Sequence, residues 1–112
     1  MGACGGAMAA NRPNLLFFIT DDQSWLDCGA YGSRYVRTPN FDRVAREGVL
    51  FQYAYVSSPS CTPSRAAILT GRNFWELEEG AMLHGPLPAK FPVLPDLLEA
   101  RGYKVGFTGK GW

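Results

Sequence analysis

The chain has 112 residues, of which 46% are hydrophobic and 19% are charged, and this ordinary globular mixture excludes the apolar-poor profile of a disordered protein. Eleven Lys and Arg residues against ten Asp and Glu residues give a net charge of +1, so no single-sign field would attract nucleic acid or anionic lipid. At this length we expect one domain at most, and no apolar run approaches the ~20 residues of a membrane-spanning helix.

The N-terminal segment 1–11 is built mainly of small, uncharged residues and has neither the basic start nor the apolar stretch of a signal peptide. We expect a disordered lead-in there and a folded part over 12–112. The three cysteines, Cys4, Cys28 and Cys61, form no CxxC pair and are odd in number. This count favours neither a zinc knuckle nor a closed disulfide framework.

The first half of the folded part predicts a strand, a helix and a second strand. The apolar run 14–20 is typical of a strand buried on both faces, and it ends at two aspartates. Thr38 can cap a helix that has Pro39 in its first position and ends at Gly48. The β-branched and aromatic segment 49–56 then predicts the second strand.

The second half continues this alternation. Thr62 and Pro63 predict the start of a helix that ends at Gly71, which leaves Cys61 just before its N-terminus. Segment 72–90 has no clear periodicity and indicates a surface excursion. A third helix over 95–100 should turn Leu97 and Leu98 inward, and 103–108 predicts a third strand.

Alternating strands and helices predict an α/β fold with a mostly parallel sheet flanked by helices. Ligands of such sheets bind beyond the carboxyl ends of the strands. The residues that follow those ends are reactive or charged: Asp21, Asp22, Cys61, Arg65 and Lys110. Two carboxylates, a thiol and two cations at one edge indicate a site for a metal and an anion.

The segment 61–65 reads C-T-P-S-R and continues as A-A-I-L-T-G-R, and here the chain resembles the type I sulfatases of the alkaline phosphatase superfamily. Two further segments agree with this resemblance: R-P-N-L-L-F-F-I-T-D-D over 12–22, and T-G-K over 108–110. The resemblance covers 12–112 and implies the N-terminal portion of an alkaline-phosphatase-like catalytic domain.

The resemblance implies that a formylglycine-generating enzyme converts Cys61 to formylglycine, an aldehyde that hydrates to a geminal diol. One hydroxyl of the diol would attack the sulfur of a sulfate ester, and the second would allow the bound sulfate to be expelled. The implied substrate is a sulfated carbohydrate, another sulfate ester or a sulfamate.

The resemblance also implies a divalent cation, Ca²⁺ in most relatives, held by Asp21, Asp22 and the converted Cys61. Arg65 would hold the hydrate, and Lys110 would contact the sulfate as a point charge. His84, the only histidine, lies in a Gly- and Pro-rich stretch and is a candidate substrate contact. Taken singly, each of these residues has an ordinary structural interpretation, such as a turn, a buried thiol or a solvated charge.

Two features depart from the family pattern. Relatives commonly read G-K-x-H, whereas Trp112 stands at the histidine position here, which we interpret as a substrate contact and as the mark of a sulfamidase-like subgroup. The family's catalytic domain is also several-fold longer, so we expect this chain to be an incomplete enzyme that is inactive alone. Relatives are often secreted or periplasmic, and the chain shows no export signal.

Two other functions stay open at this point. A phosphonate or phosphate monoester hydrolase of the same superfamily can share the C-x-P-S-R signature, and relative rates on aryl sulfate and phosphodiester substrates would separate the two. A non-catalytic fragment that binds a partner through exposed strand edges would have no reason to bind calcium through Asp21 and Asp22.

Overall fold

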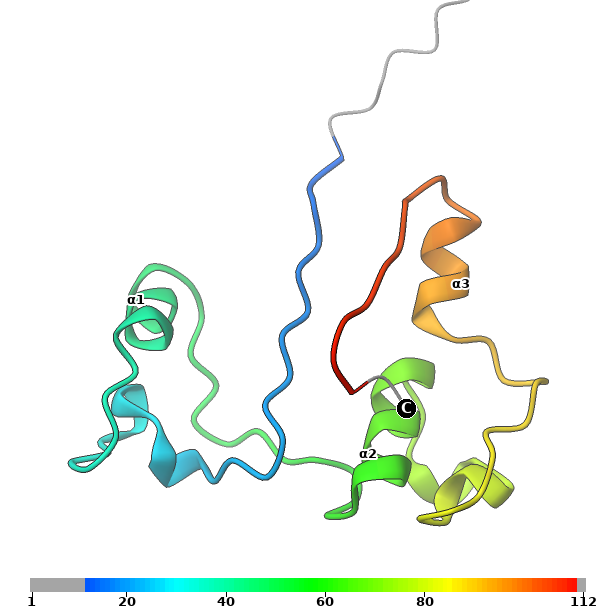
Figure 1. Cartoon of the computed structure of the whole chain (residues 1–112), viewed down its shortest axis with the longest axis horizontal. Coiled ribbons are helices and arrows are strands. Elements are labelled where there is room, and N and C mark those ends of the chain that lie inside the picture. Colours follow the sequence, from blue (N-terminus) through cyan, green and yellow to red (C-terminus); the bar gives the residue numbers. More distant parts are fainter. Residues whose placement is uncertain (1–11, 111–112) are drawn as a thin grey trace, which may run out of the picture.

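The computed structural model describes residues 12–110, and its regular structure there is entirely helical (Figure 1). The α-helices are α1 (Pro39–Glu47), α2 (Cys61–Thr70) and α3 (Leu94–Glu99). Four 3₁₀ helices accompany them: η1 (Trp25–Asp27), η2 (Gly29–Tyr31), η3 (Phe74–Glu76) and η4 (Glu78–Ala81). No helix within this range is long and apolar enough to cross a bilayer. The predicted lead-in 1–11 and Trp112 lie outside the described residues.

The helices form two groups that extended chain connects. Figure 1 shows α1 with η1 and η2 at one end, and α2 and α3 at the other, with the extended segment after residue 12 running between them. The radius of gyration is 18.3 Å, against ~13 Å for a compact domain of this length. The chain therefore buries little of its apolar surface.

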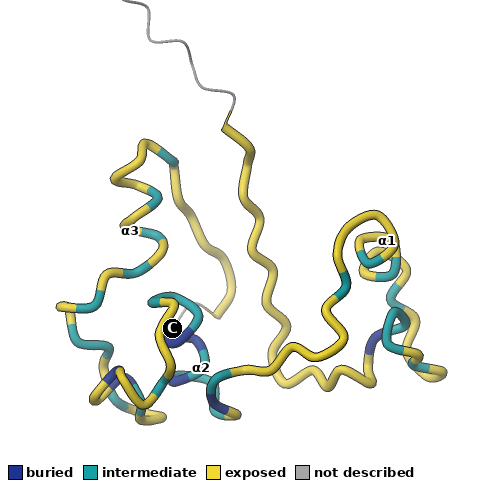
Figure 2. Tube along the Cα trace, turned by 180° about the vertical axis from the view of Figure 1, so that it is seen from behind, coloured by how far each residue is buried: buried dark blue, intermediate teal, exposed yellow. Residues whose placement is uncertain are grey.

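The three predicted strands do not pair. Segments 14–20, 49–56 and 103–108 are extended but form no β-ladder within residues 12–110, and Figure 2 shows them as almost entirely exposed. Leu16, Tyr53 and Phe107 are 91%, 86% and 86% exposed. The prediction that 14–20 is buried on both faces is wrong for this structure. A strand needs hydrogen bonds to a neighbouring strand, and these three segments do not supply one another with such a neighbour.

Helix α2 begins at Cys61 with Ser60 as its N-cap, so the predicted start at a Thr62 cap is wrong. The first helical hydrogen bond runs from the Ser64 N–H to the Ser60 carbonyl oxygen at 3.0 Å. Pro63 fits in this first turn because the N–H it lacks would have no partner within the helix. Cys61 is therefore the first residue of the helix rather than the residue before it. The predicted end at Gly71 is confirmed, since Gly71 has a φ of 66°.

The other helices follow the prediction with small shifts. Helix α1 begins at Pro39 and has Gly48 as its C-cap, as expected. Helix α3 begins at Leu94, one residue before the predicted start. Leu97, predicted to face inward, is 52% exposed, because no layer within the described residues covers that face of α3.

The buried centre of the larger group lies against α2. Ala66 and Leu77 have no exposed surface, and Ala67 is 7% exposed. Leu77 lies between η3 and η4, which both contact α2. The segment 72–90 is therefore more than the predicted surface excursion, because it supplies the one large side chain that is fully buried in the described part of the chain.

A joint of hydrogen bonds between Gly29, Thr38 and Asp42 connects the helices of the smaller group. The Thr38 hydroxyl accepts from the Gly29 N–H at 2.7 Å and donates to the Asp42 carboxylate at 2.9 Å, but it caps no N–H of α1. A Cβ atom at position 29 would lie 2.6 Å from an Asp42 carboxylate oxygen, so a side chain there would displace the Asp42 carboxylate. The predicted cap residue thus ties η2 to α1 instead.

Replacing Thr38 with Val should weaken this joint. The valine keeps the shape but loses the acceptor for the Gly29 N–H and the donor to Asp42, which should lower the free energy of unfolding by about 1 to 2 kcal/mol. Urea unfolding followed by circular dichroism measures the change. Thr38→Ser keeps the hydroxyl and is the matched control, and an equal loss in both variants would contradict the role of the hydroxyl.

Candidate functional site

Three segments that are distant in sequence meet at the carboxylate of Asp21. Arg65 Nη2 lies 3.1 Å from Asp21 Oδ1, and Lys110 Nζ lies 2.9 Å from Asp21 Oδ2. Arg65 Nη1 also donates to the backbone carbonyl oxygen of Lys110 at 2.9 Å. We call these three residues the Asp21 cluster. It brings together one carboxylate and both cations of the predicted site.

The segment that carries each member of the Asp21 cluster sets the position of its side chain. Asp21 follows the extended segment 14–20 at a bend where Asp22 adopts a φ of 53°, a conformation that aspartate tolerates better than most residues. Arg65 projects from α2 and is only 8% exposed. Lys110 follows the extended segment 103–108.

Asp21 and Lys110 shift each other's pKa values. The pKa of Asp21 lies below its ordinary value of 3.8, first because Lys110 donates to it and then because Arg65 does. The pKa of Lys110 lies above its ordinary value of 10.5, chiefly because of its hydrogen bond to Asp21, with a smaller electrostatic contribution from Cys61. Asp21 is therefore an anion and Lys110 a cation at neutral pH.

Cys61 is a free, half-buried thiol at the first position of α2. The N-terminus of a helix carries unpaired N–H groups and a partial positive charge, and both favour an anion there. The Asp21 cluster adds Arg65 from the same helix and Lys110, on whose pKa Cys61 acts. The arrangement places the Cys61 thiol near two cations, the nearly buried Arg65 and the half-exposed Lys110.

One known protein family matches nearly the whole chain, including the segments that carry Cys61 and the Asp21 cluster. Residues 13–112 match the family described as Sulfatase. The chain belongs to the sulfatase family. This match confirms the resemblance inferred from the C-T-P-S-R segment, and membership implies the alkaline-phosphatase-like α/β fold of sulfatases, although residues 12–110 form no sheet here.

Individual sulfatases are similar over nearly the whole chain. N-acetylgalactosamine-6-sulfatase of Canis lupus familiaris is 41% identical over 95% of this chain and 23% of its own length. Steryl-sulfatase of Mus musculus is 39% identical over 91% of this chain and 18% of its own length. Arylsulfatase A of Bos taurus is 39% identical over 98% of this chain and 23% of its own length. The chain thus spans about a quarter or less of the length of these relatives. No solved structure gives a significant match to it.

Not every residue predicted for the sulfatase site joins the Asp21 cluster. The Asp22 side chain is exposed and makes no hydrogen bond or ion pair within the described residues. His84 is exposed in the turn after η4 and makes no polar contact there either. The backbone carbonyl of Lys110, which accepts from Arg65, is a member of the site that sequence reasoning missed, because no residue type signals a backbone acceptor.

The site offers oxygen ligands that suit Ca²⁺, but fewer than this ion normally takes. Asp21 is held as an anion, and Asp22 adds a second, exposed carboxylate. Calcium takes about six to eight oxygen ligands. No group of three or more His, Cys, Asp or Glu side chains in residues 12–110 is placed to hold a metal ion, so Asp21, Asp22 and Cys61 do not assemble as one set. The donors fit calcium in kind and would supply part of its shell.

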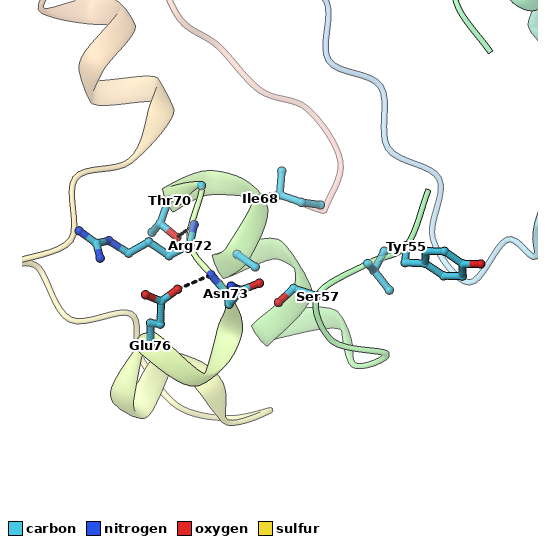
Figure 3. Close-up of a pocket in the computed structure, with 10 residues that line it drawn as sticks. Tyr55, Ser57, Ile68, Thr70, Arg72, Asn73 and Glu76 are labelled. Carbon is cyan, nitrogen blue, oxygen red and sulfur yellow. Dashed lines mark hydrogen bonds between the residues drawn. The ribbon is translucent and has the colours of Figure 1, made fainter. Parts of the chain in front are cut away.

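A pocket of about 680 Å³ lies elsewhere on α2, around its C-terminal end (Figure 3). None of the predicted sulfatase site residues lines it. Its polar groups bind one another: the Asn73 N–H donates to Glu76 at 2.9 Å, and the Arg72 N–H donates to the Thr70 hydroxyl at 3.3 Å. Since these groups do not converge on the space, the pocket offers no site comparable to the Asp21 cluster.

The Asp21 cluster should open in acid. A carboxylate whose pKa is lowered in the folded state contributes stability above its unfolded pKa, and that stability is lost as the pH falls through the folded value. The ¹³C shift of the Asp21 carboxyl should therefore titrate with a midpoint below 3.8. The midpoint should rise in Lys110→Met, which removes the main cause of the lowered pKa. A midpoint of 3.8 or above in the unaltered chain would contradict the cluster.

Proposed function

We propose that this chain carries the nucleophile and the anion-binding cations of a sulfuric ester hydrolase. The observation that supports this most is the position of Cys61 at the first residue of α2, beside the Asp21 cluster, in a chain of the sulfatase family. The reaction would break the sulfate ester and release sulfate and an alcohol.

The nucleophile would be formylglycine, made from Cys61 by a formylglycine-generating enzyme. As a hydrate it supplies a hydroxyl that attacks sulfur and a second hydroxyl for release of the product. Arg65 would orient the hydrate, because it is nearly buried and is fixed at both ends of its guanidinium by Asp21 and by the backbone of Lys110. The ammonium of Lys110, which is about half exposed, would bind a sulfate oxygen.

Asp21 and Asp22 would hold the divalent cation, Ca²⁺. When bound, such an ion favours ionisation of the nucleophile and neutralises charge that develops on the sulfate oxygens. Arg65 and the helix N-terminus keep the site positive around the attacking oxygen, which stabilises the charge of the transition state without reorganisation.

The proposed substrate is a sulfated carbohydrate. One relative is named as a sulfatase of N-acetylgalactosamine-6-sulfate, whereas others are named for steryl and aryl sulfates, so the sugar, the linkage and a sulfamate alternative are questions for assay. His84 and Trp112 are the proposed substrate contacts, and the sulfamidase-like subgroup suggested by Trp112 stays a prediction. Secretion or export to the periplasm is likewise a proposal from the family.

A chimera tests this function. Residues 12–112 would replace the matching stretch of bovine arylsulfatase A, which is similar over 98% of this chain, and the product would be co-expressed with a formylglycine-generating enzyme. We expect calcium-dependent hydrolysis of an aryl sulfate that Cys61→Ala abolishes, while Cys28→Ser, a change at the other described thiol, retains it. Turnover that survives Cys61→Ala, or a converted chimera that cleaves only phosphodiesters, would contradict the proposal.

A further inference from the structure

The Asp21 carboxylate has no oxygen without a cationic partner. Oδ1 accepts from Arg65 at 3.1 Å, and Oδ2 accepts from Lys110 at 2.9 Å. A divalent cation bound at Asp21 would use the lone pairs that these two oxygens still have, and its charge would repel the cations beside it. We therefore expect cation binding to weaken at least one of the two ion pairs through this repulsion.

The two cationic partners differ in how easily they can leave. The Arg65 side chain is 9% exposed, and its second nitrogen is bonded to the Lys110 carbonyl oxygen, so it is held on two sides. The Lys110 side chain is 49% exposed, and its ammonium sits on a flexible four-carbon stem. Lys110 is the partner that can move into solvent without disturbing α2.

We propose that Lys110 is the resident counter-ion of Asp21 and that a divalent cation displaces its ammonium, which is then free to bind the sulfate group. This inference rests on the proposed function, since it assigns an order to the cation and the anion at the same site. The cation takes Asp21 first, and the displaced ammonium becomes an anion ligand.

The bond from Arg65 to the Lys110 backbone gives this exchange its geometry. Arg65 Nη1 donates a hydrogen bond to the carbonyl oxygen of Lys110 at 2.9 Å. The backbone of Lys110 therefore stays at the site when its side chain dissociates from Asp21. The freed ammonium therefore remains beside α2, the helix that carries both Arg65 and Cys61. Cation binding and anion binding should consequently favour each other.

Calorimetric titration of Ca²⁺ into the complete chain, at low ionic strength, tests the exchange. Lys110→Met removes the competing ammonium and should tighten Ca²⁺ binding about two- to five-fold, the range expected for losing one exposed ion pair. Lys104→Met makes the same change in net charge at an exposed residue that forms no ion pair within residues 12–110, and it should leave the affinity unchanged. Equal or weaker binding by Lys110→Met would overturn the exchange.

A second measurement needs no variant. Brief acetylation with acetic anhydride, read by mass spectrometry, should label Lys110 about two- to five-fold faster when Ca²⁺ is present, while the labelling of Lys104 stays constant. If Ca²⁺ binds but leaves Lys110 labelling unchanged, the exchange is wrong and the proposed metal role stands. If Ca²⁺ binds neither the unaltered chain nor Lys110→Met, the proposed metal role fails and the exchange fails with it.

Discussion

Leu77→Ala is expected to unfold the larger helical group. Leu77 has no exposed surface and lies between η3 and η4 where they pack on α2, so its truncation leaves a cavity that rigid neighbours cannot fill. Such changes cost about 2 to 5 kcal/mol. The buried apolar side chains of α2 itself, Pro63, Ala66 and Ala67, are small, so Leu77 is the largest buried apolar side chain that packs in this group.

Urea unfolding followed by far-ultraviolet circular dichroism measures this effect. Leu97→Ala is the matched control, because it deletes the same atoms from a side chain that is 52% exposed and should change the free energy of unfolding by no more than about 0.5 kcal/mol. The pair also compares an unpredicted buried leucine with a leucine that the sequence pattern placed inside. Similar losses in both variants would contradict the packing described here.

Arg65→Ala is expected to lower turnover per converted Cys61 by about 10²- to 10³-fold in the arylsulfatase chimera, with the converted fraction measured by mass spectrometry. Arg65 binds Asp21 with one nitrogen and the Lys110 backbone with the other, so its loss frees a proposed metal ligand and a proposed sulfate ligand together. A point charge cannot replace this two-sided contact, and we therefore expect Arg65→Lys to restore only a minor part of the rate.

The rate of aryl sulfate hydrolysis at saturating calcium measures the Arg65 effect. Arg43→Ala serves as the control, since the one ion pair of Arg43 among the described residues is an exposed one with Glu47 on α1 at 3.8 Å. That variant should keep the full rate. A full rate in Arg65→Ala would show that the two contacts of Arg65 have no part in the chemistry.

Local signals in the sequence predicted the helices and the members of the Asp21 cluster. Proline near the first turn and glycine after the last one are local features, so α1 and α2 lie within two residues of their predicted bounds. The meeting of Asp21, Arg65 and Lys110 was predicted from a shared sheet edge. The structure brings them together through ion pairs and a backbone hydrogen bond, without a sheet in the described residues.

The non-local features were not predictable in this way. Whether 14–20 pairs with another strand depends on which segments lie beside it, and an apolar run carries no such information. The burial of Leu77 depends on how η3 and η4 fold back on α2, in a segment without helical or strand periodicity. The two-sided contact of Arg65 uses a carbonyl oxygen, which every residue possesses.

Conversion of Cys61 is the most direct measure of the sulfatase assignment. The chain would be co-expressed with a formylglycine-generating enzyme, alkylated and digested. Mass spectrometry would then give the mass of the peptide that spans Cys61, with the Cys28 peptide of the same sample as an internal control. We predict that the Cys61 peptide carries an aldehyde while Cys28 stays an alkylated thiol. A Cys61 peptide that remains a fully alkylated thiol would contradict the proposal that this residue is the nucleophile of a sulfatase.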